Sequence, residues 1–130
     1  MFLHRYLRGN KAQDMRRYIV EGCAVSVQNC CRFFYPEKNI VYYLGVTELT
    51  PEEFMREIRE HDRVGAYTAS RTDEELLEYT TRIISYSKAS KALCAQHNIS
   101  FIDTSRNRDT VLTSVFREIE KKISQADNEV

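Results

Sequence analysis

Glycine and proline are scarce in this chain, which has 4 glycines and 2 prolines among 130 residues. A small β-sandwich or β-barrel needs a tight turn roughly every 8–12 residues, and its turns use both residue types heavily. The scarcity therefore argues against an all-β fold. Long apolar runs are also lacking, because none approaches the roughly 18–20 residues of a membrane-spanning helix. We expect no membrane partner.

An excess of charge of either sign is missing as well. The 19 Lys and Arg residues balance the 19 Asp and Glu residues. Zero net charge argues against a general nucleic-acid coat, although it leaves room for a local phosphate site. The 42% hydrophobic and 29% charged shares are ordinary for a soluble globular protein, and the length fits one domain.

The four cysteines form no C-x-x-C motif, and two of them are adjacent, namely Cys23, Cys30, Cys31 and Cys94. This spacing suits neither a zinc knuckle nor a thioredoxin-type site, and the three histidines are scattered, so we predict no metal site. Reduced thiols in a cytoplasmic protein are the simplest interpretation. A thiol-redox or sequestering protein is an alternative, although vicinal cysteines on a helix do not easily form a disulfide.

The first residues are basic, with five Lys and Arg residues up to Arg17 against one acid, Asp14. They contain no apolar core of a secretory signal, and a transit peptide is the alternative because acids are scarce. We predict a basic N-terminal segment over residues 1–16 and a single domain over residues 17–130.

Three short apolar runs predict buried strands. They are Tyr18–Val20, Asn39–Leu44 and Ile99–Ile102, and each is followed by polar residues or glycine. The second run is apolar on both faces from Ile40 to Leu44. A strand covered on both faces belongs to a parallel sheet between layers of helices.

Helical patterns fill the intervals between the runs. Thr50-Pro51-Glu52-Glu53 and Thr72-Asp73-Glu74-Glu75 are capping boxes that start helices. The second helix should reach about Gln96, with Asn98 as a left-handed stop. Apolar spacing predicts two more helices, from about Ser26 to Tyr35 and through Leu112–Ile123. The predicted fold is therefore α/β and three-layered, with a short parallel sheet of about three strands flanked by helices.

Polar residues follow each predicted strand, and ligands bind at the carboxyl ends of parallel strands. Glu21 directly follows Tyr18–Val20. Phosphate-transfer enzymes hold a metal-bound water or a substrate hydroxyl with an acid in such a position. Glu21 is our catalytic candidate, and the alternative is a polar residue that merely ends a strand.

Arginines mark two further places. Arg63 and Arg71 flank the one long stretch without clear periodicity, and Arg106 and Arg108 follow the third strand. A guanidinium group offers phosphate a rigid, charged fork of donors. A loop that carries arginines over an anionic ligand stabilises charge and excludes water. The alternative is that these arginines are solvated surface residues.

Several segments in order resemble the later part of P-loop nucleotide or small-molecule kinases. They are Tyr18-Ile19-Val20-Glu21-Gly22-Cys23, the segment from Ile40 to Glu53, the Arg71 loop, Ser87-Lys88, and the segment from Ile99 to Asp109. The resemblance implies that Glu21 is the acid ending the family's third strand. It places Arg63 to Arg71 in the lid.

The same resemblance implies a nucleotide ligand, such as ATP with magnesium, or a phosphorylated small molecule. The residues that would lie against the adenine base or the phosphates follow the third strand, and they are Asp103, Thr104, Ser105, Asn107 and Arg108.

The chain departs from the family at one decisive point. The phosphate-binding loop G-x-x-x-x-G-K-[ST] is missing, since none of the four glycines is followed by lysine. The family's first strand, which lies between the strands matching Tyr18–Val20 and Ile40–Leu44, is missing too. The topology is thus an incomplete P-loop kinase-like one. We expect a rearranged deletion, a fragment of a longer protein, or one half of an assembly.

The function predicted from these features is a kinase-like α/β domain that retains part of a nucleotide or phosphate site but does not transfer phosphoryl groups independently. Activity completed by another polypeptide is one variant of this hypothesis. The alternative is a non-catalytic interaction or regulatory module that acts as a homo-oligomer or with a partner chain. The strand edges and Phe33-Phe34-Tyr35 would form its interface, unless those aromatic residues pack in the core.

Overall fold

A computed structural model describes residues 22, 25–33 and 39–128. The chain divides into two units, Met1–Asn39 and Ile40–Val130. The described part of the first unit contains one helix, α2 (Val27–Phe33). The Ser26 side chain accepts the N–H of Asn29 at 3.2 Å and so caps this helix. The predicted basic segment and the predicted strand Tyr18–Val20 lie outside the described residues, and so do Glu21 and Cys23.

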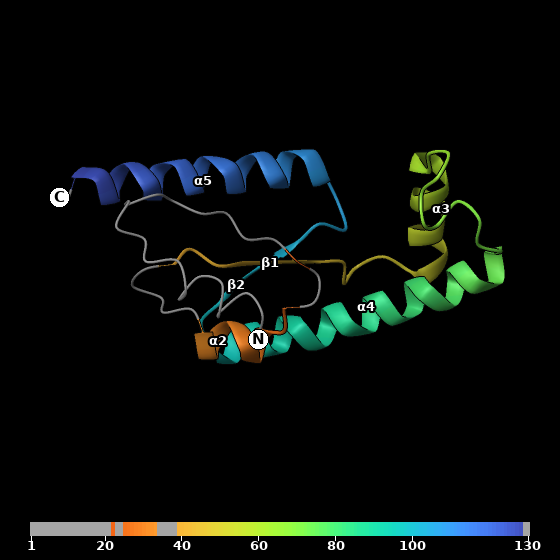
Figure 1. The fold of residues 1–130 in the computed structure, drawn as a ribbon, viewed down its shortest axis with the longest axis horizontal. Helices are drawn as coiled ribbons and strands as arrows, with labels where there is room; N and C mark the ends of the chain where they lie inside the picture. The colour runs from red at the N-terminus through yellow and green to blue at the C-terminus, as the bar shows by residue number, and fades with distance from the viewer. Residues whose placement is uncertain (1–21, 23–24, 34–38, 129–130) are drawn as a thin grey trace. The chain divides into compact units, whose positions relative to one another are not determined.

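The second unit alternates strands and helices, as Figure 1 shows. The elements in order are β1 (Tyr42–Gly45), α3 (Pro51–His61), α4 (Asp73–Gln96), β2 (Ser100–Asp103) and α5 (Arg108–Asn128). The strands β1 and β2 pair in parallel, with Tyr42 opposite Ser100 and Gly45 opposite Asp103. The α/β class and the parallel pairing are confirmed for these two strands.

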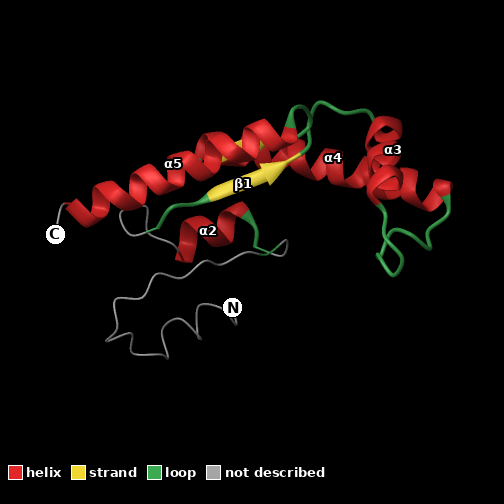
Figure 2. Ribbon diagram, turned by 90° about the horizontal axis from the view of Figure 1, so that it is seen from above, coloured by secondary structure: helices red, strands yellow, loops and turns green. Residues whose placement is uncertain are grey.

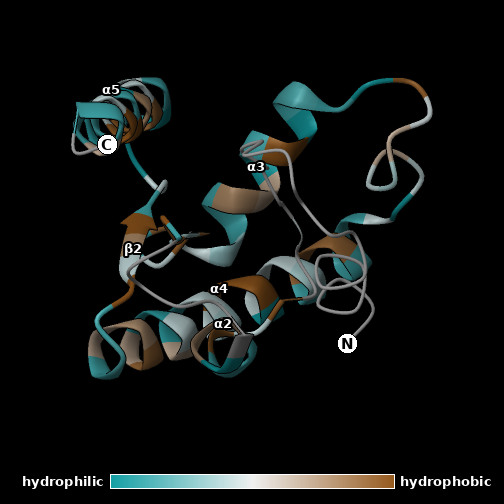
Figure 3. Ribbon diagram, turned by 60° about the vertical axis from the view of Figure 1, so that its left-hand side comes forward, coloured by the Kyte–Doolittle hydropathy of each residue, from teal (hydrophilic) through white to brown (hydrophobic). Residues whose placement is uncertain are grey.

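Helices lie on both faces of the strand pair (Figures 1 and 3). The helix α4 packs against both strands and against α3, and the Ser87 side chain accepts the N–H of Val46 at 3.1 Å. On the other face, Lys122 of α5 lies 3.1 Å from the Tyr42 hydroxyl. Figure 2 shows α5 running alongside β1.

Local signals set the helix ends. The capping boxes at Thr50 and Thr72 are both present, with reciprocal hydrogen bonds to Glu53 and Glu75. These bonds satisfy backbone N–H groups that have no partner within the helix. The helix α4 ends at Gln96, and Asn98 has a φ of 55°. The predicted helix starts and the left-handed stop are confirmed.

The buried face of α4 packs against α3 and against both strands. The buried residues of this helix are Leu76, Thr80, Ile84, Ser87, Ser90 and Cys94. Three of the six carry a hydroxyl group. Small side chains let the sheet approach closely, most of all at Gly45. A Cβ atom at Gly45 would overlap the Phe101 ring and lie 3.1 Å from the Cβ of Ser87. Glycine is therefore required there by space.

The predicted cover over both faces of β1 is only partly present. Leu44 is 57% exposed and Ile40 is 45% exposed. The reason is that α5 lies over this face without packing closely, since Val115 is its one buried residue among those described. The expectation of a fully covered strand is therefore wrong for this face.

Two further observations concern membranes and thiols. Of the helices in the described part of the chain, none has both the length and the apolar character needed to cross a membrane. Cys30 and Cys94 are buried, and Cys31 is exposed.

Candidate functional site

The residues predicted as a site fall in two places in the second unit. One is the carboxyl end of β1 and β2. The other is the segment of residues 62–72 between α3 and α4, which we call the arginine loop. They lie at opposite ends of α3, whose 11 residues span roughly 16 Å at 1.5 Å per residue. The structure therefore does not bring the two sets of residues together.

Asp103 is the centre of the strand-end group. Its carboxylate accepts the hydroxyls of Thr47 and Ser105. It also accepts the backbone N–H of Ser105 at 3.0 Å. Thr47 follows β1 and Ser105 follows β2, so this carboxylate joins the ends of the two strands.

The residues that follow Asp103, Thr104 and Ser105, also form hydrogen bonds within the fold. Ser105 is 5% exposed, and its Oγ accepts the N–H groups of Thr47 and Glu48 at 3.1 and 3.0 Å. Thr104 donates its N–H to the carbonyl of Gly45 at 2.8 Å and its hydroxyl to the same oxygen at 3.2 Å. These polar groups bind one another across the strand ends.

The pKa of Asp103 reflects the same contacts. Burial raises the pKa, but the hydrogen bonds from the side chains and backbone of Ser105 and Thr47 together outweigh it. The net effect is a pKa below the usual value of 3.8. The carboxylate is therefore charged near neutral pH and serves as an acceptor within the fold.

The residues after Ser105 face the solvent. Arg106 is 58% exposed, and one of its guanidinium nitrogens lies 3.7 Å from Glu53 in the first turn of α3. Asn107 has a φ of 50°, and its carbonyl accepts the N–H of Val111 at 2.9 Å, which starts α5. Arg108 is exposed. Among the predicted residues of this segment, Asn107 and Arg108 are thus the accessible ones.

The arginine loop is ordered although its sequence shows no period. Successive turns close between Arg63 and Ala66, between Ala66 and Ala69, and between Thr68 and Arg71, with N···O distances of 2.9 to 3.1 Å. Gly65 has a φ of 86°, a conformation that side-chain-bearing residues rarely adopt. The backbone therefore folds into a compact series of turns.

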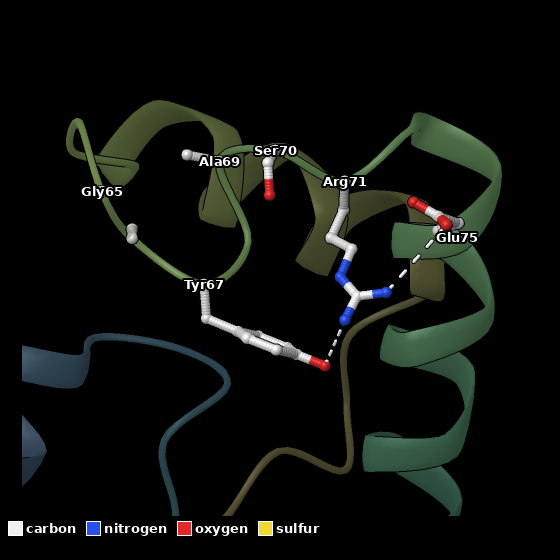
Figure 4. Close-up of a pocket in the computed structure, with 7 residues that line it drawn as sticks. Gly65, Tyr67, Ala69, Ser70, Arg71 and Glu75 are labelled. Atoms are coloured by element: carbon white, nitrogen blue, oxygen red, sulfur yellow. Dashed lines mark hydrogen bonds and ion pairs between the residues drawn. The ribbon is translucent and has the colours of Figure 1, made fainter.

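Residues of the arginine loop line a hollow of about 490 Å³ that is open to solvent (Figure 4). Its lining residues are Gly65, Ala66, Tyr67, Ala69, Ser70, Arg71 and Glu75. Arg63 is exposed in the same loop but is not among them. Of the two predicted lid arginines, the structure places Arg71 in the hollow.

Arg71 is held in place by two side chains. One of its nitrogens donates to the Tyr67 hydroxyl at 2.5 Å, and the guanidinium carbon lies 4.6 Å from the centre of the Tyr67 ring. Another nitrogen lies 4.0 Å from a carboxylate oxygen of Glu75. The Arg71 side chain remains 39% exposed. A guanidinium has five N–H groups, so this arrangement leaves donors for an anion.

Sequence reasoning missed Arg59. This side chain, in the last turn of α3, binds the backbone carbonyls of Thr68 and Arg71 and the carboxylates of Asp62 and Asp73. An arginine at the end of a helix, followed by a loop with acids at both ends, is the sequence signal for such a brace. By itself that signal is weak, because the partners are backbone groups.

Among the described residues, no group of three or more His, Cys, Asp or Glu side chains is placed to hold a metal ion. Comparison of the chain with family models, with curated proteins and with solved structures found no match.

Proposed function

We propose that this chain is a kinase-like α/β domain that binds a nucleotide or another phosphate-bearing ligand and does not transfer phosphoryl groups on its own. The observation that carries the proposal is the position of Arg71. Its guanidinium is oriented by Tyr67 and Glu75 at the hollow of the arginine loop, and it is partly exposed.

The surroundings of Arg71 favour an anionic ligand. Planar guanidinium groups bind phosphate oxygens with two parallel hydrogen bonds, and a fixed guanidinium loses less entropy on binding than a mobile one. The Ser70 side chain lines the same hollow and adds a hydroxyl donor. Glu75 lies 4.0 Å from Arg71, so the ligand would compete with this exposed ion pair, which is weak.

The absence of a phosphate-binding loop sequence supports the second half of the proposal. Phosphoryl transfer depends on positioning the phosphates and on stabilising their charge, and that loop supplies much of both. Arg71 offers a contact for binding a phosphate but does not replace that loop. The strand-end residues Asp103 and Ser105 hydrogen-bond to each other and to Thr47, so they are poorly placed to replace it.

Isothermal titration with ATP, and with a nonhydrolysable analogue, tests the binding claim. We expect the purified chain to bind both ligands, and Arg71→Met to weaken binding by about tenfold or more, the effect of losing a charge-assisted hydrogen bond. Arg82→Met is the matched control, because Arg82 is an exposed arginine on α4. Equal binding by the wild type and Arg71→Met would overturn the assignment of Arg71.

A second candidate function is an interaction module that acts as a homo-oligomer or with a partner chain. The specific observation in its favour is the exposure of large apolar side chains, with Leu44 at 57%, Phe116 at 62% and Tyr86 at 54%. Isolated apolar residues on a surface are common, so the oligomeric state decides. A strict monomer by light scattering at high concentration counts against this function.

A further inference from the structure

We propose that Arg59 is a positioning residue for Arg71: its guanidinium braces the arginine loop and so fixes the arginine that meets the anion. The inference rests on the proposed function for its consequence in binding. The brace itself does not depend on the proposed function, because it can be measured without a ligand.

The first part of the brace consists of backbone contacts. One terminal nitrogen of Arg59 donates to the carbonyl of Thr68 at 3.3 Å, and the other donates to the carbonyl of Arg71 at 2.5 Å. The bond to the Arg71 carbonyl acts on the backbone of the residue whose side chain lies in the hollow. Arg59 itself does not line the hollow, so any effect on a ligand would be transmitted through the loop.

The second part of the brace consists of carboxylates that hold the Arg59 side chain. Asp73, in the first turn of α4, accepts hydrogen bonds from two nitrogens of Arg59 at 3.0 and 3.3 Å. Asp62, at the end of α3, lies 3.5 Å away and also accepts the hydroxyl of Thr68. The Asp62 side chain is 14% exposed and that of Arg59 is 32% exposed. One side chain thus joins both ends of the arginine loop.

The geometry requires arginine rather than any cation. Two carbonyls and two carboxylates lie around one group, and a planar guanidinium with five donors can serve all four. A lysine ammonium is a single point with three donors and cannot span the same set. The backbone hydrogen bonds within the arginine loop otherwise close only short-range turns. Loss of Arg59 should therefore loosen residues 63–71.

The test uses Arg59→Met, Arg59→Lys and the control Arg82→Met in the full chain, with two measurements. In hydrogen exchange by mass spectrometry, we expect both Arg59 variants to speed exchange in residues 63–71 about tenfold, with exchange in α5 unchanged. In titration with inorganic pyrophosphate, we expect Arg59→Met to weaken binding about tenfold. Arg59→Lys keeps the charge, so it separates a lost brace from a lost cation.

A double variant separates positioning from direct contact. If Arg59 acts through Arg71, Arg59→Met should weaken pyrophosphate binding no further in a chain that already carries Arg71→Met. A full additional tenfold loss in the double variant would overturn the positioning role. Unchanged exchange of residues 63–71 in both Arg59 variants would overturn the brace. Absence of pyrophosphate binding by the wild type, with faster loop exchange in the variants, would instead contradict the proposed function and leave the brace supported.

Discussion

At the scale of single residues, Asp103 shows how an acid at a strand end can serve the fold. Its carboxylate accepts the side chains of Thr47 and Ser105, and Ser105 in turn accepts two backbone N–H groups. Each group removed from this cluster leaves a partly buried partner without a hydrogen bond. Such losses cost about 1–3 kcal/mol each.

We therefore predict that Asp103→Asn lowers the free energy of unfolding by about 1–3 kcal/mol at pH 7. Burial raises the folded-state pKa of Asp103, but the hydrogen bonds from Ser105 and Thr47 lower it by more, so that the pKa lies below 3.8. The charged form thus stabilises the fold above the unfolded pKa, and this contribution is lost as the pH falls through the folded pKa. Urea unfolding from about pH 5 to about pH 2 should show a flatter pH dependence for the variant.

Glu78→Gln is the control for this prediction, because Glu78 is exposed on α4. It should leave both the stability at pH 7 and its pH dependence within about 0.5 kcal/mol of the wild type. A wild-type stability that falls with acid no faster than that of Asp103→Asn would contradict the role given to the carboxylate.

Gly45 gives a second prediction at this scale. A Cβ there would overlap the Phe101 ring and crowd Ser87, so Gly45→Ala should destabilise the protein by about 1–3 kcal/mol, the usual cost of overpacking. The same substitution at Gly22, where the nearest heavy atom would lie 3.7 Å away, is the matched control. Thermal unfolding of both variants measures the difference, and equal melting temperatures would refute the packing argument.

At the scale of elements, the sequence predicts best what short-range chemistry determines. The capping boxes at Thr50 and Thr72 and the stop at Asn98 each depend on residues within a few positions, and all three are present. The two described strands were recognisable because they are short apolar runs bounded by polar residues or glycine. Their parallel pairing followed from the helices between them.

Contacts between distant residues were harder to predict. The sequence predicts Asp103 and Ser105 as ligand-binding residues. Their bonds to Thr47 join positions 56 and 58 residues apart, and no local pattern encodes such contacts. The contacts of Arg59 escaped prediction because two of its partners are carbonyls, and every residue has one. Whether the strand-end residues also touch a ligand stays a prediction.

The helix α5 is attached to the rest of the second unit by few contacts. Lys122 lies 3.1 Å from the Tyr42 hydroxyl and 3.1 Å from Glu118, and its ammonium lies 5.1 Å from the centre of the Tyr42 ring. These contacts, led by the bond to Tyr42, raise the pKa of Lys122 above 10.5. The charged lysine therefore stabilises the docking of α5 below that value, and the contribution is lost as the pH rises through the folded pKa.

We predict that Lys122→Met speeds amide exchange in α5 by about two- to fivefold, a small effect because the pair is half-exposed. Lys121→Met is the control, since it removes the neighbouring exposed lysine. Exchange that is equally fast in both variants would show that Lys122 has no special role in holding α5.

At the scale of the whole molecule, we assign separate tasks to the two ends of α3. The strand-end group joins β1, β2 and α4 through hydrogen bonds. The arginine loop carries a braced hollow with an accessible guanidinium. Two paired strands are marginal alone, so the internal bonds at the strand ends have a structural task to perform. We therefore expect ligand binding at the arginine loop.

Phosphorus NMR of ATP with magnesium, in the presence of the purified chain, tests this central claim with a single method. The account predicts that the wild type broadens or shifts the phosphate resonances, that Arg71→Met largely removes this effect, and that inorganic phosphate and ADP accumulate no faster than in buffer. Unchanged resonances with the wild type, or ADP formed at a rate that depends on the protein, would contradict it.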